Sequence, residues 1–170
     1  MSHYSNLVLI EPTEDVETAV KEAMGVHKAQ GGFWDWYQIG GRWTGVLDGY
    51  NPDKDPVNIE TCWLCQGTGT RQDMKVENGC NGCLGTGKKE KWPTKYAKHP
   101  GDIAPIETLT DESYKNFFRV VTPGCIIFGG EDYLPWKPVG EMFPEREMPP
   151  LDWLKENYKG YLAVVVDNHS

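Results

Sequence analysis

The stretch Asn6-Leu-Val-Leu-Ile-Glu-Pro-Thr-Glu-Asp-Val-Glu-Thr-Ala-Val-Lys-Glu-Ala-Met-Gly25 decides how the fold begins. Its first five residues form an apolar run that is typical of a short strand. Apolar side chains then recur with the spacing of one helix face, at Val16, Ala19, Val20, Ala23 and Met24. Thr13 is a good N-cap and Gly25 a good terminator, so the stretch predicts a strand followed by an amphipathic helix.

A second helix and strand are predicted at the other end of the sequence, in the reverse order. Residues Leu151 to Tyr158 follow Pro150 and stop before Gly160, as a short helix does. The apolar run Tyr161 to Val166 has no polar interruption and therefore predicts a central strand.

Two strand pairs are expected between these ends. The segments Phe33 to Ile39 and Arg42 to Leu47 flank two glycines and predict a bent hairpin. The segments Phe117 to Val121 and Cys125 to Phe128 flank a Pro-Gly turn and predict another. The order β, α, hairpin, hairpin, α, β favours an α+β sandwich on the ferredoxin-like plan, with an antiparallel sheet and two helices.

Composition changes sharply between the two hairpins. Six of the 19 glycines fall between Gly67 and Gly87, and the hydrophobic periodicity disappears. Residues 61–98 hold seven Lys or Arg against three Asp or Glu, although the whole chain has a net charge of -8. We therefore predict an α+β core domain of residues 1–60 and 99–170, and an inserted zinc-binding segment at 61–98.

The bulk composition narrows the function classes. A net charge of -8 and a pI near 5.0 argue against a general nucleic-acid binder, which needs a basic surface. No apolar run reaches the length of a membrane span, and the first residues lack the apolar core of a signal peptide. We expect a cytoplasmic protein, in which closely paired cysteines usually bind a metal rather than form disulfides.

Two matching octapeptides contain four of the five cysteines: Cys62-Trp-Leu-Cys65-Gln-Gly-Thr-Gly69 and Cys80-Asn-Gly-Cys83-Leu-Gly-Thr-Gly87. Four thiolates complete the tetrahedral shell that Zn²⁺ prefers, so we predict one structural zinc ion on these cysteines. A full sulfur shell leaves no position for a catalytic water. A redox dithiol and incidental cysteines are the alternatives. Incidental cysteines would not fall into two matching octapeptides, and a thioredoxin-like dithiol needs one pair that opens a helix rather than two pairs followed by glycines.

The repeated Cys-x-x-Cys-x-Gly-x-Gly motif resembles the cysteine-rich zinc domain of DnaJ-type chaperones, and small regulators such as anti-TRAP share it. The resemblance covers residues 61–89. The chaperone domain has twice as many repeats, so the two repeats here imply a single zinc ion. His99-Pro-Gly101 is not the J-domain tripeptide His-Pro-Asp, so the resemblance implies no co-chaperone role.

A second motif, Trp34-Asp-Trp-Tyr-Gln-Ile-Gly-Gly-Arg-Trp43, combines indoles, paired glycines and an arginine. The glycines allow close approach, the guanidinium can bind a phosphate or carboxylate, and the indoles can stack on a planar group. In a ferredoxin-like sheet the first and last strands interleave, which would bring Asp167 and His169 near. We predict a site for a small anionic or nucleotide-like ligand formed by Trp34, Trp36, Arg42, Trp43, Asp167 and His169. The alternative is that the tryptophans are core residues and that Arg42 pairs with Asp35 or Asp48.

The same motif is similar to one in small, functionally uncharacterised phage proteins that share Asp-Trp-Tyr-x-x-Gly-Gly-Arg-Trp, a Thr-Pro-x-Gly turn and an acid-x-His ending. The matching segments are Asp35 to Trp43, Thr122 to Gly124 with altered turn spacing, and Asp167 to His169. The resemblance implies a phage or mobile-element setting, hence the host cytoplasm, and a shared site without a known activity.

Three functions remain open at this point. The favoured one is a non-enzymatic binding protein that captures a small anionic or nucleotide-like ligand, which in a phage would mean counter-defence by sequestering a host signal. The second is an inhibitor that docks on a host protein through the zinc segment. The third is a phosphodiester-acting enzyme that uses His169, Asp167 and Arg42. A homo-oligomer is compatible with each of them.

Overall fold

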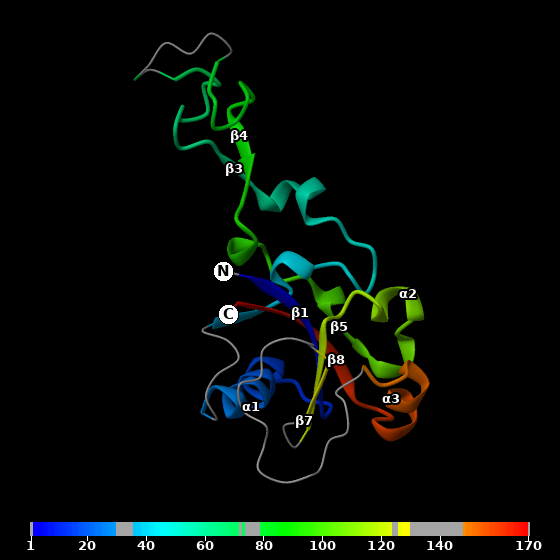
Figure 1. The fold of residues 1–170 in the computed structure, drawn as a ribbon. Coiled ribbons are helices and arrows are strands. Elements are labelled where there is room, and N and C mark those ends of the chain that lie inside the picture. The colour runs from blue at the N-terminus through cyan, green and yellow to red at the C-terminus, as the bar shows by residue number, and fades with distance from the viewer. Residues whose placement is uncertain are drawn as a thin grey trace. The chain divides into compact units, whose positions relative to one another are not determined.

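The computed structural model describes residues 2–29, 36–71, 73, 79–123, 126–129 and 148–169. The chain divides into two compact units (Figure 1), residues 1–50 with 99–170 and residues 51–98, which we call the core and the insert. The second unit starts ten residues earlier than the segment at 61–98 expected from composition. Trp34 of the predicted ligand site, and Cys125, lie outside the described residues.

The core is a mixed α+β unit, which confirms the expected class. Its sheet has the strand order β2-β8-β1-β6-β7, with β5 pairing on β8. The strands are β1 (His3–Ile10), β2 (Trp36–Ile39), β5 (Ile103–Pro105), β6 (Arg119–Thr122), β7 (Ile126–Gly129) and β8 (Leu162–His169). The helices are α1 (Val16–Ala29), α2 (Asp111–Tyr114) and α3 (Leu151–Asn157).

One pair of strands departs from the purely antiparallel, ferredoxin-like sheet that we expected. Strands β1 and β6 are parallel neighbours, with Leu7 opposite Val120. Parallel neighbours require a crossover connection, and α1 lies in the chain between these two strands. The remaining pairs, β1–β8, β2–β8, β5–β8 and β6–β7, are antiparallel.

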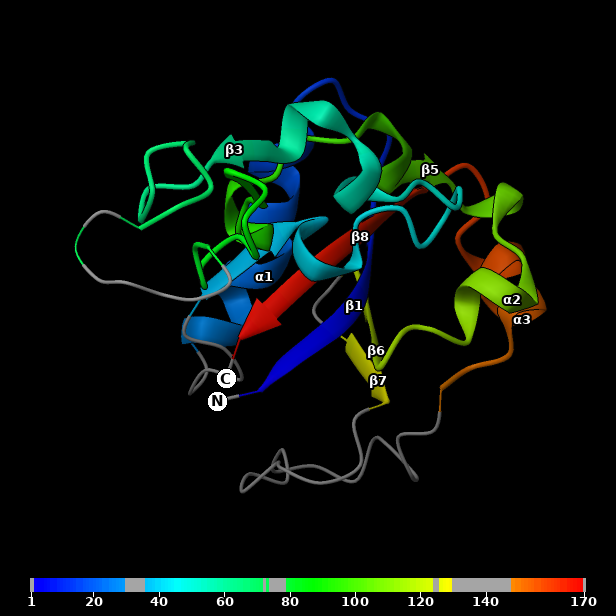
Figure 2. The same ribbon diagram turned by 90° about the horizontal axis from the view of Figure 1, so that it is seen from above.

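The two faces of the sheet bury different sets of side chains because neighbouring residues of a strand point to opposite faces. Leu7 and Leu9 of β1 pack on one face together with Leu151 and Leu154 of α3. Val8 and Ile10 pack on the other face against residues of α1. In Figures 1 and 2, α1 accordingly lies on one side of the sheet, and α2 and α3 lie on the other.

Helix α1 has the predicted amphipathic face but different ends. The carboxylate of Asp15 accepts the N–H of Thr18 at 3.1 Å, so Asp15 is the N-cap, and Thr13 instead accepts the N–H of Asp15. The helix passes through Gly25 and continues to Ala29. The prediction that Gly25 ends the helix is therefore wrong, because a glycine within a helix costs only about 1 kcal/mol.

The predicted hairpin of residues 33–47 is also wrong. Strand β2 pairs with β8, and after Gly40 the chain enters the short 3-10 helix η1 (Gly41–Trp43). The second predicted hairpin is confirmed, since β6 pairs with β7. Strand β8 continues beyond the predicted end at Val166 to His169, because Asp167 to His169 pair with β1 on one side and β2 on the other.

The insert has little regular structure. A two-stranded antiparallel ladder joins β3 (Ile59–Thr61) and β4 (Lys88–Glu90). The short 3-10 helices η2 (Pro52–Lys54), η3 (Pro56–Asn58) and η4 (Pro93–Lys95) flank this ladder in the sequence. The buried apolar cluster of the insert consists of the four cysteines, with Leu64 partly buried against them. In the part of the chain that the structure describes, no helix has the length and apolarity needed to cross a membrane.

Candidate functional site

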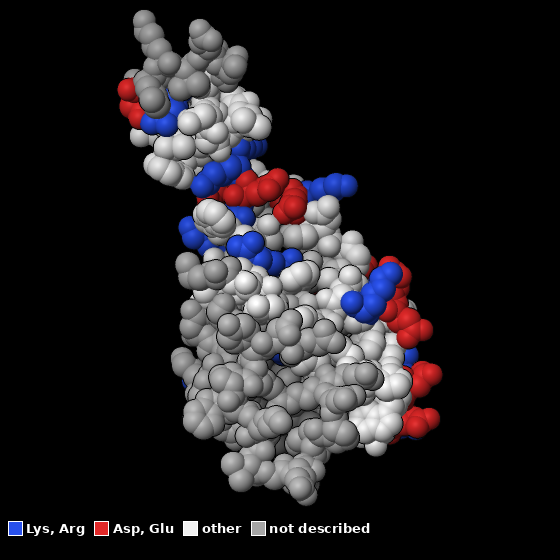
Figure 3. Space-filling model, viewed as in Figure 1, with Lys and Arg blue, Asp and Glu red and all other residues white. Residues whose placement is uncertain are grey.

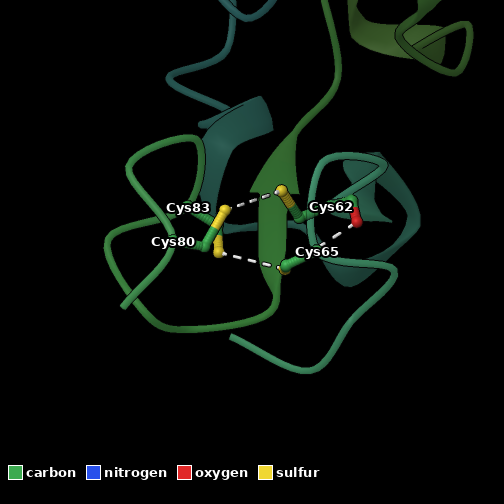
Figure 4. Close-up of side chains that lie close together, drawn as sticks. All are labelled: Cys62, Cys65, Cys80 and Cys83. Carbon is green, nitrogen blue, oxygen red and sulfur yellow. Dashed lines mark hydrogen bonds between the residues drawn. The ribbon is translucent and has the colours of Figure 1, made fainter. Parts of the chain in front are cut away.

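The four predicted metal ligands converge in the insert. Cys62, Cys65, Cys80 and Cys83 are all buried, and their four sulfur atoms lie within 4.8 Å of one another (Figure 4). The Sγ–Sγ separation is 3.8 Å for Cys62 and Cys80 and 3.7 Å for Cys65 and Cys83. All four are free thiols.

These separations fit a tetrahedral metal site. Four sulfur atoms about 2.3 Å from a central zinc ion would be separated by about 3.8 Å along each edge of the tetrahedron. A disulfide would need about 2.05 Å. The four cysteines can therefore hold a metal ion in the geometry that zinc takes, and four sulfur ligands would fill its shell.

The two octapeptides fold into equivalent loops, which we call knuckles. The Gly69 N–H donates to Cys65 Sγ at 3.3 Å, and the Gly87 N–H donates to Cys83 Sγ at 3.2 Å. A Cβ on Gly69 would lie 2.3 Å from the carbonyl oxygen of Gly85 in the other knuckle. A Cβ on Gly87 would likewise lie 2.2 Å from the carbonyl oxygen of Gly67. The last glycine of each motif is thus required where the two knuckles cross.

The electrostatic surroundings of the thiols differ. Burial alone would raise the pKa of Cys65, but hydrogen bonds from Gly69, Cys83 and Gly67 outweigh it and lower that pKa to about 7. Burial raises the pKa of Cys80 to about 11. A metal ion must displace protons from such thiols, so its affinity falls as the pH falls.

The core contains a second candidate site, which we call the Asp167 cluster: His3, Trp36, Asp167, His169 and the backbone of Arg42. Asp167 is fully buried. Its Oδ1 lies 3.0 Å from Nδ1 of His3, and its Oδ2 accepts the backbone N–H of Arg42 at 3.0 Å. One buried carboxylate therefore joins β1, β8 and η1.

The paired glycines of the motif are explained by close approach to buried carboxylates. Gly41 has a φ of 57°, and a Cβ there would lie 2.6 Å from Asp167 Oδ2. Gly40 has a φ of 73°, and a Cβ there would lie 2.3 Å from Oδ2 of Asp102. Asp102 is also buried and accepts the Gly45 N–H at 2.9 Å, and burial raises its pKa. The loop that carries Arg42 is thus held at both ends.

Three rings lie side by side on neighbouring strands. Trp36 and His169 are partners in the β2–β8 register, and their rings stack at 5.5 Å with an interplanar angle of 8°. The ring of His3 meets both edge-on, at 5.4 Å from Trp36 and 5.0 Å from His169. His169 is 7 % exposed, so it is a buried strand residue.

The structure therefore brings Trp36, Asp167 and His169 together, and it places Arg42 beside them through its backbone. Arg42 is exposed, and no side-chain hydrogen bond or ion pair involves its guanidinium among the described residues. The alternative pairing with Asp48 is wrong, since Asp48 Oδ2 lies 2.6 Å from Nε2 of His99. The pairing with Asp35 falls outside the described residues.

Trp43 is separate from this cluster. It is half-buried and packs against the core around Leu7 and Leu9, as the packing alternative had it. Its Nε1 is buried and has no hydrogen-bond partner in the described part of the chain. Sequence reasoning missed His3 and Asp102 altogether. His3 is the first residue of β1, and Asp102 directly precedes β5.

The fold and these sites define an α+β protein with a second unit in which four buried cysteines could hold a metal ion. No family model, curated protein or solved structure matches the chain.

Proposed function

We propose that the protein is a non-enzymatic binding protein that captures a small anionic or nucleotide-like ligand on the loop of Arg42. The observation that supports this is the difference between the backbone and the side chain of Arg42. The backbone N–H of Arg42 is fixed by the buried Asp167, while its guanidinium is exposed and unpaired among the described residues. A guanidinium on a fixed loop binds phosphate or carboxylate at a low ordering cost.

The geometry favours binding over the phosphodiester-acting enzyme. Asp167 already uses one oxygen with His3 and the other with the Arg42 N–H, so it serves as an anchor. His169 is buried and stacked on Trp36, which holds its ring in place. Neither residue is presented to a substrate as a general acid or base must be.

Calorimetry of the zinc-loaded chain against inorganic phosphate, mononucleotides and cyclic dinucleotides tests this function. A charge-assisted bidentate contact contributes about 1.5–3 kcal/mol, so Arg42→Ala should weaken binding at least about tenfold. Lys21→Ala, which removes an equal charge from the exposed side of α1, is the control and should leave the affinity unchanged. Heat-silent titrations throughout, or equal affinity for Arg42→Ala, would contradict the proposal.

We propose further that the insert holds one structural Zn²⁺ in the manner of the DnaJ-type repeat. The tetrahedral separation of four buried sulfur atoms supports this. The insert has a buried cluster of cysteines rather than hydrocarbon side chains, so metal binding would supply its folding free energy. Mass spectrometry of the native chain should find one zinc per chain, and a different metal or none would refute it.

The phage setting and the sequestration of a host signal remain proposals that rest on the resemblance of the Arg42 motif. The panel of cyclic dinucleotides in the calorimetry addresses them directly. A second candidate function, docking on another protein through the insert, is favoured by one observation: Trp63 is 68 % exposed and Leu84 86 % exposed, one in each knuckle.

A further inference from the structure

His3 is the side chain that can neutralise the buried carboxylate of Asp167. Asp167 is fully buried, and its Oδ1 lies 3.0 Å from Nδ1 of His3. Among the described residues, His3 is the only basic side chain within ion-pair distance of this carboxylate. A buried carboxylate is costly unless hydrogen bonds and an opposite charge compensate it. The protonation state of His3 therefore sets the net charge of the pair.

The imidazole of His3 can exchange protons with the solvent. Its side chain is 19 % exposed, whereas that of Asp167 is not exposed at all. Histidine is the side chain that changes its charge between about pH 5 and pH 8. A protonated ring donates from Nδ1 in every case, while a neutral ring does so in only one of its two tautomers. Protonation of His3 therefore strengthens the contact with Asp167 and cancels the negative charge of the carboxylate.

The groups that face the His3 ring come from three neighbouring elements. From β8, the ring of His169 lies 5.0 Å away, and from β2 the ring of Trp36 lies 5.4 Å away. From η1, the backbone N–H of Arg42 reaches the pair through Oδ2 of Asp167. His169 is buried and stacked on Trp36. In the described part of the chain, the titratable groups beside His3 are thus Asp167 and His169, and Asp167 is the one that pairs with it.

The charge of this pair acts on the place where we expect the anion to bind. Oδ2 of Asp167 accepts the N–H of Arg42, so the carboxylate lies at the base of the arginine side chain. An anion on the guanidinium would be on the order of one Debye length, about 8–10 Å, from the carboxylate. With His3 neutral, the negative charge of Asp167 opposes the anion. With His3 protonated, the pair is neutral and this repulsion disappears.

The rest of the core is negatively charged, which adds to the effect. Residues 1–50 and 99–170 contain nineteen Asp or Glu and nine Lys or Arg, a formal charge of -10. Figure 3 shows acidic side chains over α2 and α3 on the face of the core that it displays. An anion therefore approaches a negatively charged unit, and the loss of one negative charge beside Arg42 favours its binding.

We propose that His3 regulates the Arg42 site as a pH-dependent switch: an anion binds more tightly when the His3 imidazole is protonated and more weakly when it is neutral. The inference rests on the proposed capture of an anion by Arg42 and adds the regulation of that site. His3 acts through Asp167, so it is a positioning residue. For one unit of charge at this separation we expect roughly a three- to tenfold difference in affinity.

Calorimetry of the native full chain at about pH 6 and about pH 8 tests the switch, with metal content measured on the same samples. Sulfate and cyclic dinucleotides are the probes, because their charge is constant in this range, whereas a phosphate monoester titrates near about pH 6. Binding should be roughly three- to tenfold tighter at the lower pH. By linkage, the chain should also take up protons as the anion binds, so the binding enthalpy should depend on the ionisation enthalpy of the buffer.

His3→Gln separates the charge of His3 from its hydrogen bond. Glutamine can still donate to Asp167 but cannot be protonated, so this variant should bind the probes equally at both pH values and take up no protons. His27→Gln is the matched control and should keep the pH dependence. His27 belongs to α1, which packs on the face of the sheet opposite to Leu7 and Leu9, and His3 alternates onto the same face as these leucines. In the wild-type chain without anion, the Arg42 amide resonance should shift with the same midpoint as the ring resonances of His3.

The outcomes distinguish the switch from the anion site on which it rests. No binding of any probe at either pH overturns anion capture and the switch together. Equal affinity at both pH values, or a pH dependence that survives in His3→Gln, overturns the switch and leaves anion capture standing. If His3→Gln does not fold, the wild-type resonances decide. An Arg42 amide that does not follow the His3 ring, or that follows His169 instead, overturns the role of His3.

Discussion

Replacing Gly41 by alanine should reduce the free energy of unfolding of the core by more than the cost of placing alanine in a left-handed conformation. A non-glycine residue at the observed φ of 57° costs roughly 1–2 kcal/mol. The new Cβ would also lie 2.6 Å from Cβ and Oδ2 of the fully buried Asp167, which must then move away from the Arg42 N–H. Losing a hydrogen bond to a buried carboxylate costs about 1.5–3 kcal/mol, so we expect a total of about 3–5 kcal/mol.

Gly49 provides the matched control for this measurement. Its φ is 79°, and a Cβ there would meet nothing within 4 Å, so Gly49→Ala isolates the backbone cost of roughly 1–2 kcal/mol. Urea unfolding of both zinc-loaded variants, followed by amide resonances of the sheet, gives the two free energies of unfolding. Equal losses in Gly41→Ala and Gly49→Ala would refute the close approach to Asp167 as the reason for the paired glycines.

Three further predictions concern the metal, the pH and one buried hydroxyl. A strong chelator should shift the amide resonances of residues 51–98 and leave those of the sheet in place; unchanged insert resonances in a metal-free chain would show that the metal is not structural. Burial raises the pKa of the Asp102 carboxyl in the folded chain above its value in the unfolded chain. The protonated carboxyl therefore stabilises the fold below the ordinary aspartate pKa, and this stabilisation is lost as the pH rises through the pKa of the folded chain. Asp102→Asn should flatten that part of the stability–pH curve, and an unaltered curve would contradict this. Tyr114→Phe should cost about 0.5–1.5 kcal/mol in urea unfolding, because the hydroxyl donates to the Pro149 carbonyl at 2.7 Å; no loss would show that the bond is immaterial.

The clustering of the four cysteines could be predicted from sequence because their geometry is local. Each knuckle positions two sulfur atoms with hydrogen bonds that span only four residues, such as Gly69 N–H to Cys65 Sγ. Because the motif occurs twice, the sequence also predicts that both knuckles fold alike, and they form matching hydrogen bonds. The amphipathic face of α1 was predictable for the same reason, since it depends on spacing within one turn.

Strand pairing could not be predicted in the same way. Glycines at 40 and 41 signal a chain reversal, but they do not say whether β2 pairs with the next segment or with β8, more than 120 residues later. The parallel pairing of β1 with β6 is likewise decided by how the chain crosses the sheet. Side chains alternate between the two faces of a strand in both kinds of pair, so this alternation does not reveal the direction of the neighbouring strand.

His3 and Asp102 escaped prediction because their partners are distant in the sequence. His3 and Asp167 form a hydrogen bond although they are 164 residues apart in the sequence, and Asp102 accepts the N–H of Gly45, which is 57 residues away. A buried carboxylate that anchors backbone amides leaves no repeated pattern, whereas cysteines at metal spacing do. The same distance explains why Arg42 looked like a ligand residue while the role of Asp167 as its anchor stayed hidden.

The two sites consequently depend on folding in different ways. The cysteine centre is complete within residues 62–83, so a metal ion can assemble it without the sheet. The Asp167 cluster needs the first, second and last strands of the core in register, with His3, Trp36 and His169 on one rung. Loss of that register separates Asp167 from the Arg42 N–H and frees the loop. The presentation of Arg42, and with it any anion affinity, therefore follows the global stability of the core, while metal content does not.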